Sequence, residues 1–187
     1  MALPFTASWR AARIRRRQAE RVVERLRQEP DEADVAWLGD AAANGDGDHA
    51  RWELRYARAA LGLLVAQRDA LDDRTVAEIA RTYTDALAAD PHIASDRRDL
   101  AERQFNERLM AYREALQVRG GPVSAPDAVG RCLLAFASDG ARTAGAPLAY
   151  AIELLERYAD EAAAVLREAY GEARLPEDVP PSVLRQG

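Results

Sequence analysis

The chain has 187 residues, of which 48% are hydrophobic and 6% aromatic, and its formal net charge is −5. This length and apolar content exclude a natively disordered chain and predict one soluble domain that buries on the order of 70% of its unfolded surface. The single cysteine excludes an internal disulfide, and with it a small secreted domain held together by such bonds.

The composition predicts an all-α fold. Ala, Leu, Arg and Glu account for 101 of the 187 residues, whereas the β-branched residues Val, Ile and Thr account for only 20. The first group favours helices and the second favours strands. We therefore expect a single-domain, up-and-down helical bundle of about six to seven helices over residues 1–171, followed by an extended, Pro-rich C-terminal tail over residues 172–187.

Helix-breaking and helix-capping residues predict the bounds of the first two helices. The first is expected from about residue 8 to residue 29, because Pro30 cannot continue it. Asp31 is a suitable N-cap for a short second helix that extends to about residue 43. The Asn44–Gly47 turn then ends this helix.

The third and fourth helices differ in their apolar pattern. The third, residues 48–70, contains the apolar run Ala59–Ala66, which has no polar side and predicts a central, buried helix. In the fourth helix, Thr75 and Glu78 have the spacing of a capping box. Asp90-Pro91 is expected to end that helix.

Three further helices are expected in the rest of the chain. Ser95 is a candidate N-cap for a helix that extends to Val118. Its predicted inward residues are Ala101, Phe105, Leu109, Tyr112 and Leu116. A short helix begins near Ser124, and the last helix begins near Pro147, which the first turn of a helix tolerates. The last helix has an apolar seam at spacings of four and three residues: Leu148, Ile152, Leu155, Ala159, Ala162, Leu166 and Ala169.

The charges are distributed unevenly along the chain. Residues 1–29 carry a net charge of +5 and residues 30–187 a net charge of −10. Apolar residues in the second half of the first helix predict that this half docks on the bundle. The first half offers mainly alanines to a core, and the sequence leaves open whether it docks, projects or frays. The predicted binding residues lie in this first half: Trp9, Arg10, Arg13, Arg15, Arg16 and Arg17.

Three kinds of partner fit such a basic helix: an acidic protein surface, nucleic acid and an anionic membrane surface. Among these we favour a protein partner, which includes self-association with an acidic patch on another copy. The alternative to all three is a solvated helix face that binds no partner. The sequence pI of about 5.2 counts against nucleic acid. The longest uncharged apolar run, Ala59–Ala66, is too short for a transmembrane segment. Arginine in place of lysine and the abundance of alanine are typical of a GC-rich bacterial coding sequence, so we expect a cytoplasmic protein.

An alternative site is the loop before the last helix. Ser138, Arg142 and Thr143 could hold a small anionic ligand near exposed helix amides, as a ligand-binding or enzymatic domain would require. This loop lacks the spacing of a Walker loop. The primary interpretation of the sequence is therefore an interaction or scaffold protein.

Metal and catalytic chemistry have little support in the sequence. Asp46, His49 and Glu53 share a helix face, but no second carboxylate–histidine pair completes a metal site. Cys132 lies in an apolar run and is interpreted as a buried small hydrophobe. We expect no metal, no cofactor and no catalytic residue, and we interpret the chain as more typical of a binding protein than of an enzyme.

Overall fold

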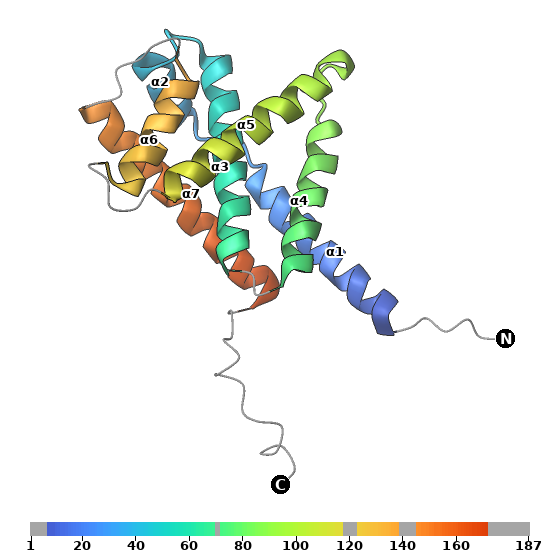
Figure 1. The fold of residues 1–187 in the computed structure, drawn as a ribbon. Helices are drawn as coiled ribbons and strands as arrows, with labels where there is room; N and C mark the ends of the chain where they lie inside the picture. The colour runs from blue at the N-terminus through green and yellow to red at the C-terminus, as the bar shows by residue number, and fades with distance from the viewer. Residues whose placement is uncertain (1–6, 70–71, 118–122, 139–144, 172–187) are drawn as a thin grey trace, which may run out of the picture.

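The computed structural model describes residues 7–69, 72–117, 123–138 and 145–171 (Figure 1). Within these ranges the chain forms seven α-helices, one short 3-10 helix and no β-strand, which confirms the predicted all-α fold. The elements are α1 (Ala7–Leu26), α2 (Glu32–Ala41), α3 (Gly47–Asp69), α4 (Asp73–Ala88), η1 (Ser95–Arg97), α5 (Arg98–Leu116), α6 (Ala125–Phe136) and α7 (Ala146–Tyr170). The predicted tail, residues 172–187, lies outside the described residues.

Helix α3 is the centre of the bundle, as its sequence predicts. Every residue from Ala59 to Ala66 is buried, and α3 packs against α2, α5 and α7. Helix α7 uses the predicted seam, with Leu148, Leu155 and Leu166 buried, and it also buries Tyr158. None of the helices in the described ranges is both long and apolar enough to cross a bilayer.

Three of the predicted helix starts are confirmed. The Asp31 carboxylate accepts a hydrogen bond from the Ala33 N–H at 2.8 Å and caps α2. The Ser124 hydroxyl accepts one from the Asp127 N–H at 3.2 Å and caps α6. Pro147 lies in the first turn of α7. Asp31 and Ser124 each accept a hydrogen bond from a backbone N–H that has no partner within the helix. Pro147 has no backbone N–H, so none is left without a partner at its position.

Two predicted caps are wrong. The capping box at Thr75 and Glu78 does not form, because α4 begins earlier and Asp72 caps it by accepting from the Arg74 N–H at 3.0 Å. A carboxylate is at least as good an N-cap as a threonine hydroxyl, so the upstream residue starts the helix. Ser95 makes no side-chain cap either, since it begins η1, which leads directly into α5.

The buried face of α5 matches the prediction at Ala101, Phe105 and Tyr112, but Arg108 and Ala115 are buried at the positions beside the predicted Leu109 and Leu116. Arg108 is buried, whereas Leu116 is 47% exposed. The Arg108 guanidinium forms two bonds with the carboxylate of Glu53 on α3, at 2.8 and 3.1 Å, and lies 4.4 Å from the ring centre of Phe136. The core tolerates an arginine here because a buried carboxylate neutralises its charge.

A second cluster of charges holds the end of α1 against α3 and the end of α4. Asp90, whose side chain is only 1% exposed, accepts bonds from Arg27 at 3.1 Å and Arg55 at 2.6 Å. It also accepts from the His92 N–H at 2.9 Å. Burial alone would raise the pKa of Asp90, but the His92 N–H and the Arg27 guanidinium outweigh it and hold the pKa below its ordinary value.

The two halves of α1 have different surroundings. In the second half Ala19, Val22, Val23 and Leu26 are buried against α4 and α7. Leu26 also packs closely over Gly62 of α3, where there is no space for a Cβ atom. The first half has no buried residue among those whose side chains are described, and Figure 1 shows its turns extending beyond the rest of the bundle. This arrangement presents the predicted binding residues on an anchored but projecting helix.

Candidate functional site

The solvent-exposed side of α1 presents four arginines on one face, from its projecting half into the half that docks on the bundle. Arg10, Arg13, Arg17 and Arg21 are all exposed. At about 100° per residue, their positions fall within an arc of roughly 80° and extend over roughly 16 Å of the helix. We call these four residues the arginine surface.

Two exposed apolar side chains flank the arginine surface. Trp9 is 47% exposed and Ile14 is 58% exposed, and both are among the few large hydrophobic residues on the described surface. The Arg13 guanidinium lies 5.4 Å from the centre of the Trp9 ring, within the range of a cation–π contact. The site therefore combines positive charge with apolar area, as protein interfaces do.

Most of the arginines in this part of α1 have no carboxylate partner. Of the five predicted ones, Arg16 alone forms an ion pair within the described ranges, with Glu20 at 3.0 Å. Several arginines of the bundle do have such partners: Arg51, for example, pairs with Glu32 at 2.8 Å and Arg58 pairs with Glu161 at 3.4 Å. The arginine surface is thus a set of charges that neighbouring helices do not neutralise.

Arg15 faces α4 and lines a surface groove with a volume of about 440 Å³. The groove is lined by Trp9, Ala12, Arg13, Arg15, Arg16, Arg74 and Glu78. Arg74 adds a positive charge from α4 that the sequence analysis missed, because no local pattern connects it to α1. The Arg74 N–H lowers the pKa of Asp72, and the charge of Arg15 contributes in the same direction.

The alternative anion site can be described only in part. Ser138 follows α6 and is half-buried, whereas Arg142 and Thr143 lie outside the described residues. The structure therefore leaves this site as a prediction from sequence.

The three residues considered for a metal site are each engaged in other interactions, and the Asp46 carboxylate accepts a hydrogen bond from the His49 N–H at 2.9 Å. His49 Nε2 lies 3.1 Å from the Phe136 carbonyl oxygen, and Glu53 is bound to Arg108. No group of three or more His, Cys, Asp or Glu side chains in the described part of the chain could hold a metal ion. Cys132 is half-buried, and burial raises the pKa of its thiol.

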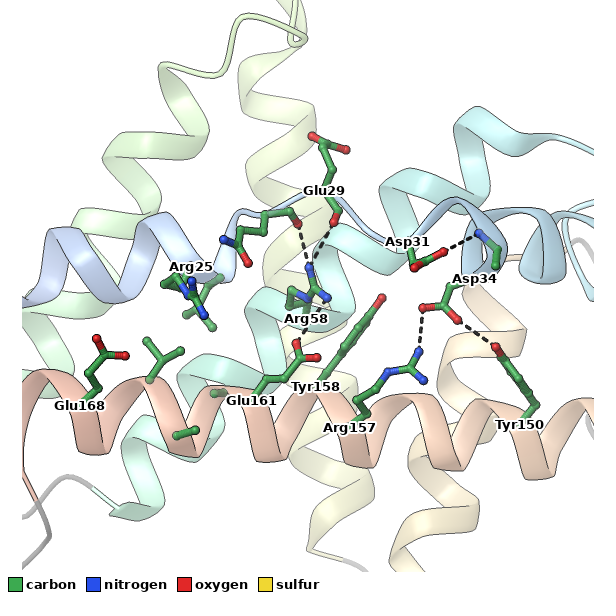
Figure 2. A pocket seen from close by; sticks show the side chains of 16 residues that line it. Arg25, Glu29, Asp31, Asp34, Arg58, Tyr150, Arg157, Tyr158, Glu161 and Glu168 are labelled. Atoms are coloured by element: carbon green, nitrogen blue, oxygen red, sulfur yellow. Dashed lines mark hydrogen bonds and ion pairs between the residues drawn. The ribbon is translucent and has the colours of Figure 1, made fainter.

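A larger cavity, of about 790 Å³, lies where the end of α1 and the start of α2 meet α7 (Figure 2). Asp34 is buried at its side and accepts bonds from Tyr150 Oη at 2.9 Å and from Arg157 at 2.7 Å. Its charge is thus met by α7, and these bonds connect α2 to α7.

Arg58 occupies the other side of this cavity. It donates to the Gln28 carbonyl at 2.9 Å, just beyond the end of α1, and its guanidinium lies 4.3 Å from the ring centre of Tyr158 (Figure 2). Burial raises the pKa of Tyr158 to about 12. The Tyr158 hydroxyl has no hydrogen-bond partner among the described residues, but it is buried and therefore closed to a ligand in the cavity. We interpret the polar lining as a set of bonds that hold helix ends together.

The arginine surface is therefore a cluster of positive charges that have no carboxylate within ion-pair distance in the described part of the chain. No known protein family, curated protein or solved structure matches this chain.

Proposed function

We propose that the protein is an interaction module, and that its arginine surface docks onto an acidic surface of a protein partner. The observation that carries this proposal is the set of exposed guanidiniums at Arg10, Arg13, Arg17 and Arg21, which have no carboxylate within ion-pair distance in the described ranges. Guanidinium groups bind carboxylates in a bidentate geometry, and each such ion pair between exposed groups contributes roughly 0.2–1 kcal/mol to the free energy of interaction.

The surroundings of the arginine surface favour a protein over other polyanions. Trp9 and Ile14 supply apolar area beside the charges. The chain as a whole has a formal charge of −5, so a long polyanion such as nucleic acid would be repelled outside this helix. An acidic protein surface can instead contact α1 alone.

A labelled polyglutamate peptide tests the proposal, with binding to the full chain measured by fluorescence anisotropy. The variant R10E/R13E/R17E should bind the peptide at least about tenfold more weakly, because several favourable pairs become repulsive. Glutamate is as good a helix former as arginine and is favourable in the first turns, so α1 should persist in the variant. Circular dichroism checks this.

The matched control is R97E/R98E/R103E, which makes the same change in net charge at exposed arginines on η1 and α5. It should bind the peptide nearly as tightly as the unmodified protein. Equal losses in the two variants would show that net charge alone controls binding and would reject the site. Absence of peptide binding, together with binding of anionic vesicles or single-stranded oligonucleotides, would reject a protein partner.

A further inference from the structure

Helix α7 presents a row of carboxylates on the side that faces away from the bundle. Glu153, Glu156 and Asp160 are exposed, and none of them has a guanidinium within ion-pair distance in the described ranges. At about 100° per residue they fall within an arc of roughly 60°, opposite to buried Leu155 and Ala162. We call these three residues the acidic stripe.

The acidic stripe and the arginine surface have the same spacing. Arg10, Arg13 and Arg17 are separated by three and then four residues, and so are the three carboxylates of the stripe. Each set extends over roughly 10 Å of its helix. Two such helices placed side by side bring all three opposite charges together: in parallel orientation the heights coincide, and in antiparallel orientation the middle pair is offset by only about 1.5 Å.

These two surfaces cannot meet within one molecule. Helix α1 is fixed to the C-terminal end of α7, where the Gln18 side chain donates to the Ala169 carbonyl at 2.7 Å. Ala19 and Val22, on the side of α1 opposite to the arginine surface, are buried in the bundle. The acidic stripe lies on the outward side of the same α7, at least nine residues from this contact, or roughly 14 Å along the helix.

We propose that a second copy of this chain is the acidic partner, and that the arginine surface of one copy docks onto the acidic stripe of the other. This inference rests on the proposed function, because it names the partner of the same surface. Ala149 and Ala164 lie along the same side of α7 and are exposed, so short side chains flank the stripe and allow a helix to approach closely. Ile14 and Trp9 flank the arginines on the other copy.

The net charge of −5 does not oppose this contact strongly at physiological salt. The Debye length there is about 8 Å, so charges beyond the interface are largely screened, whereas the guanidiniums and carboxylates in contact are not. The association should therefore weaken steeply as salt rises towards about 1 M, where the Debye length is about 3 Å.

Sedimentation velocity of the full chain over a range of concentrations tests the inference. The unmodified protein should self-associate, and both R10E/R13E/R17E and E153R/E156R/D160R should weaken the association at least about tenfold. The control D40R/E102R/E114R makes the same charge change as the α7 variant at exposed carboxylates elsewhere, and should associate like the unmodified protein.

Mixing the α1 variant R10E/R13E/R17E with the α7 variant E153R/E156R/D160R gives the most specific result. In the mixture every contact between the two variants again joins opposite charges, so association should be stronger than that of either variant alone. This recovery also shows that both variants are folded. An unmodified chain that stays monomeric, an α7 variant that associates normally, or a mixture that does not recover would each overturn the inference.

The polyglutamate measurement separates this inference from the proposed function. A monomeric chain that still binds polyglutamate through Arg10, Arg13 and Arg17 would overturn the self-association and keep the docking surface. A chain that neither self-associates nor binds the peptide would overturn both.

Discussion

Replacing Arg108 by methionine should destabilise the protein strongly, because it leaves the carboxylate of Glu53 buried without a cation. The Glu53 side chain is 3% exposed and that of Arg108 is 9% exposed, and their two bonds are 2.8 and 3.1 Å long. Removing one partner of such a pair typically costs about 3–5 kcal/mol. The variant can relieve the buried charge by protonating the carboxyl, which for an ordinary glutamate at pH 7 costs about 3.7 kcal/mol. We therefore expect R108M to lower the free energy of unfolding by about 3–4 kcal/mol.

Urea unfolding followed by far-ultraviolet circular dichroism measures this loss. The double variant E53M/R108M is the control, since it replaces both charges by apolar side chains of similar length and should recover to within about 1 kcal/mol of the unmodified protein. The deficit of R108M should also shrink as the pH falls from about 7 to about 5, because the folded variant then binds a proton more readily. A loss below about 1 kcal/mol in R108M, or a double variant no more stable than R108M, would refute this account of the core.

Three further predictions follow from single sites. The pKa of Asp90 is lowered in the folded protein, so its contribution to stability is present above the unfolded pKa of about 3.9 and is lost as the pH falls through the folded value. The stability difference between the unmodified protein and D90N should therefore shrink below about pH 4. A difference independent of pH would contradict this. Gly62→Val should cost about 1–3 kcal/mol in urea unfolding, because its side chain displaces Leu26, and unchanged stability would show that the contact is not tight. Burial raises the pKa of the Cys132 thiol, so iodoacetamide should modify it more slowly in the native protein than in urea, as mass spectrometry can follow; equal rates would count against burial of the thiol.

The parts of the fold that depend on local sequence could be predicted. Asp31 and Ser124 cap their own helices, and Pro147 begins one, so these boundaries need no information from elsewhere. The uninterrupted apolar run in α3 could be interpreted in the same way, because a helix with no polar side must be surrounded by others.

Part of the buried face of α5 depends on a distant residue and was therefore missed, although Ala101, Phe105 and Tyr112 were predicted correctly. Counting apolar residues selects Leu116 and rejects Arg108, since arginine is rarely buried. The structure buries Arg108 because Glu53, 55 residues earlier in the chain, lies opposite it. No pattern within α5 carries this information, so the apolar pattern could not place Arg108 among the buried residues.

The candidate site also has features that follow from local sequence and features that depend on tertiary packing. The clustering of arginines on one side of α1 follows from their spacing, but whether their charges are met depends on which helices lie beside them. Arg16 is paired within α1 itself, by Glu20 one turn later. Only the packing of α4 brings Arg74 beside α1, and only the packing of α7 places the acidic stripe on its outer side.

Nuclear magnetic resonance of the full chain during titration with polyglutamate tests the central claim most directly, because it locates the contact without changing any residue. The largest backbone amide shifts should fall on residues 9–21 of α1, with little change at Arg97, Arg98 and Arg103. Shifts of similar size at these control arginines, or the largest shifts outside α1, would contradict the assignment of the arginine surface as the docking site.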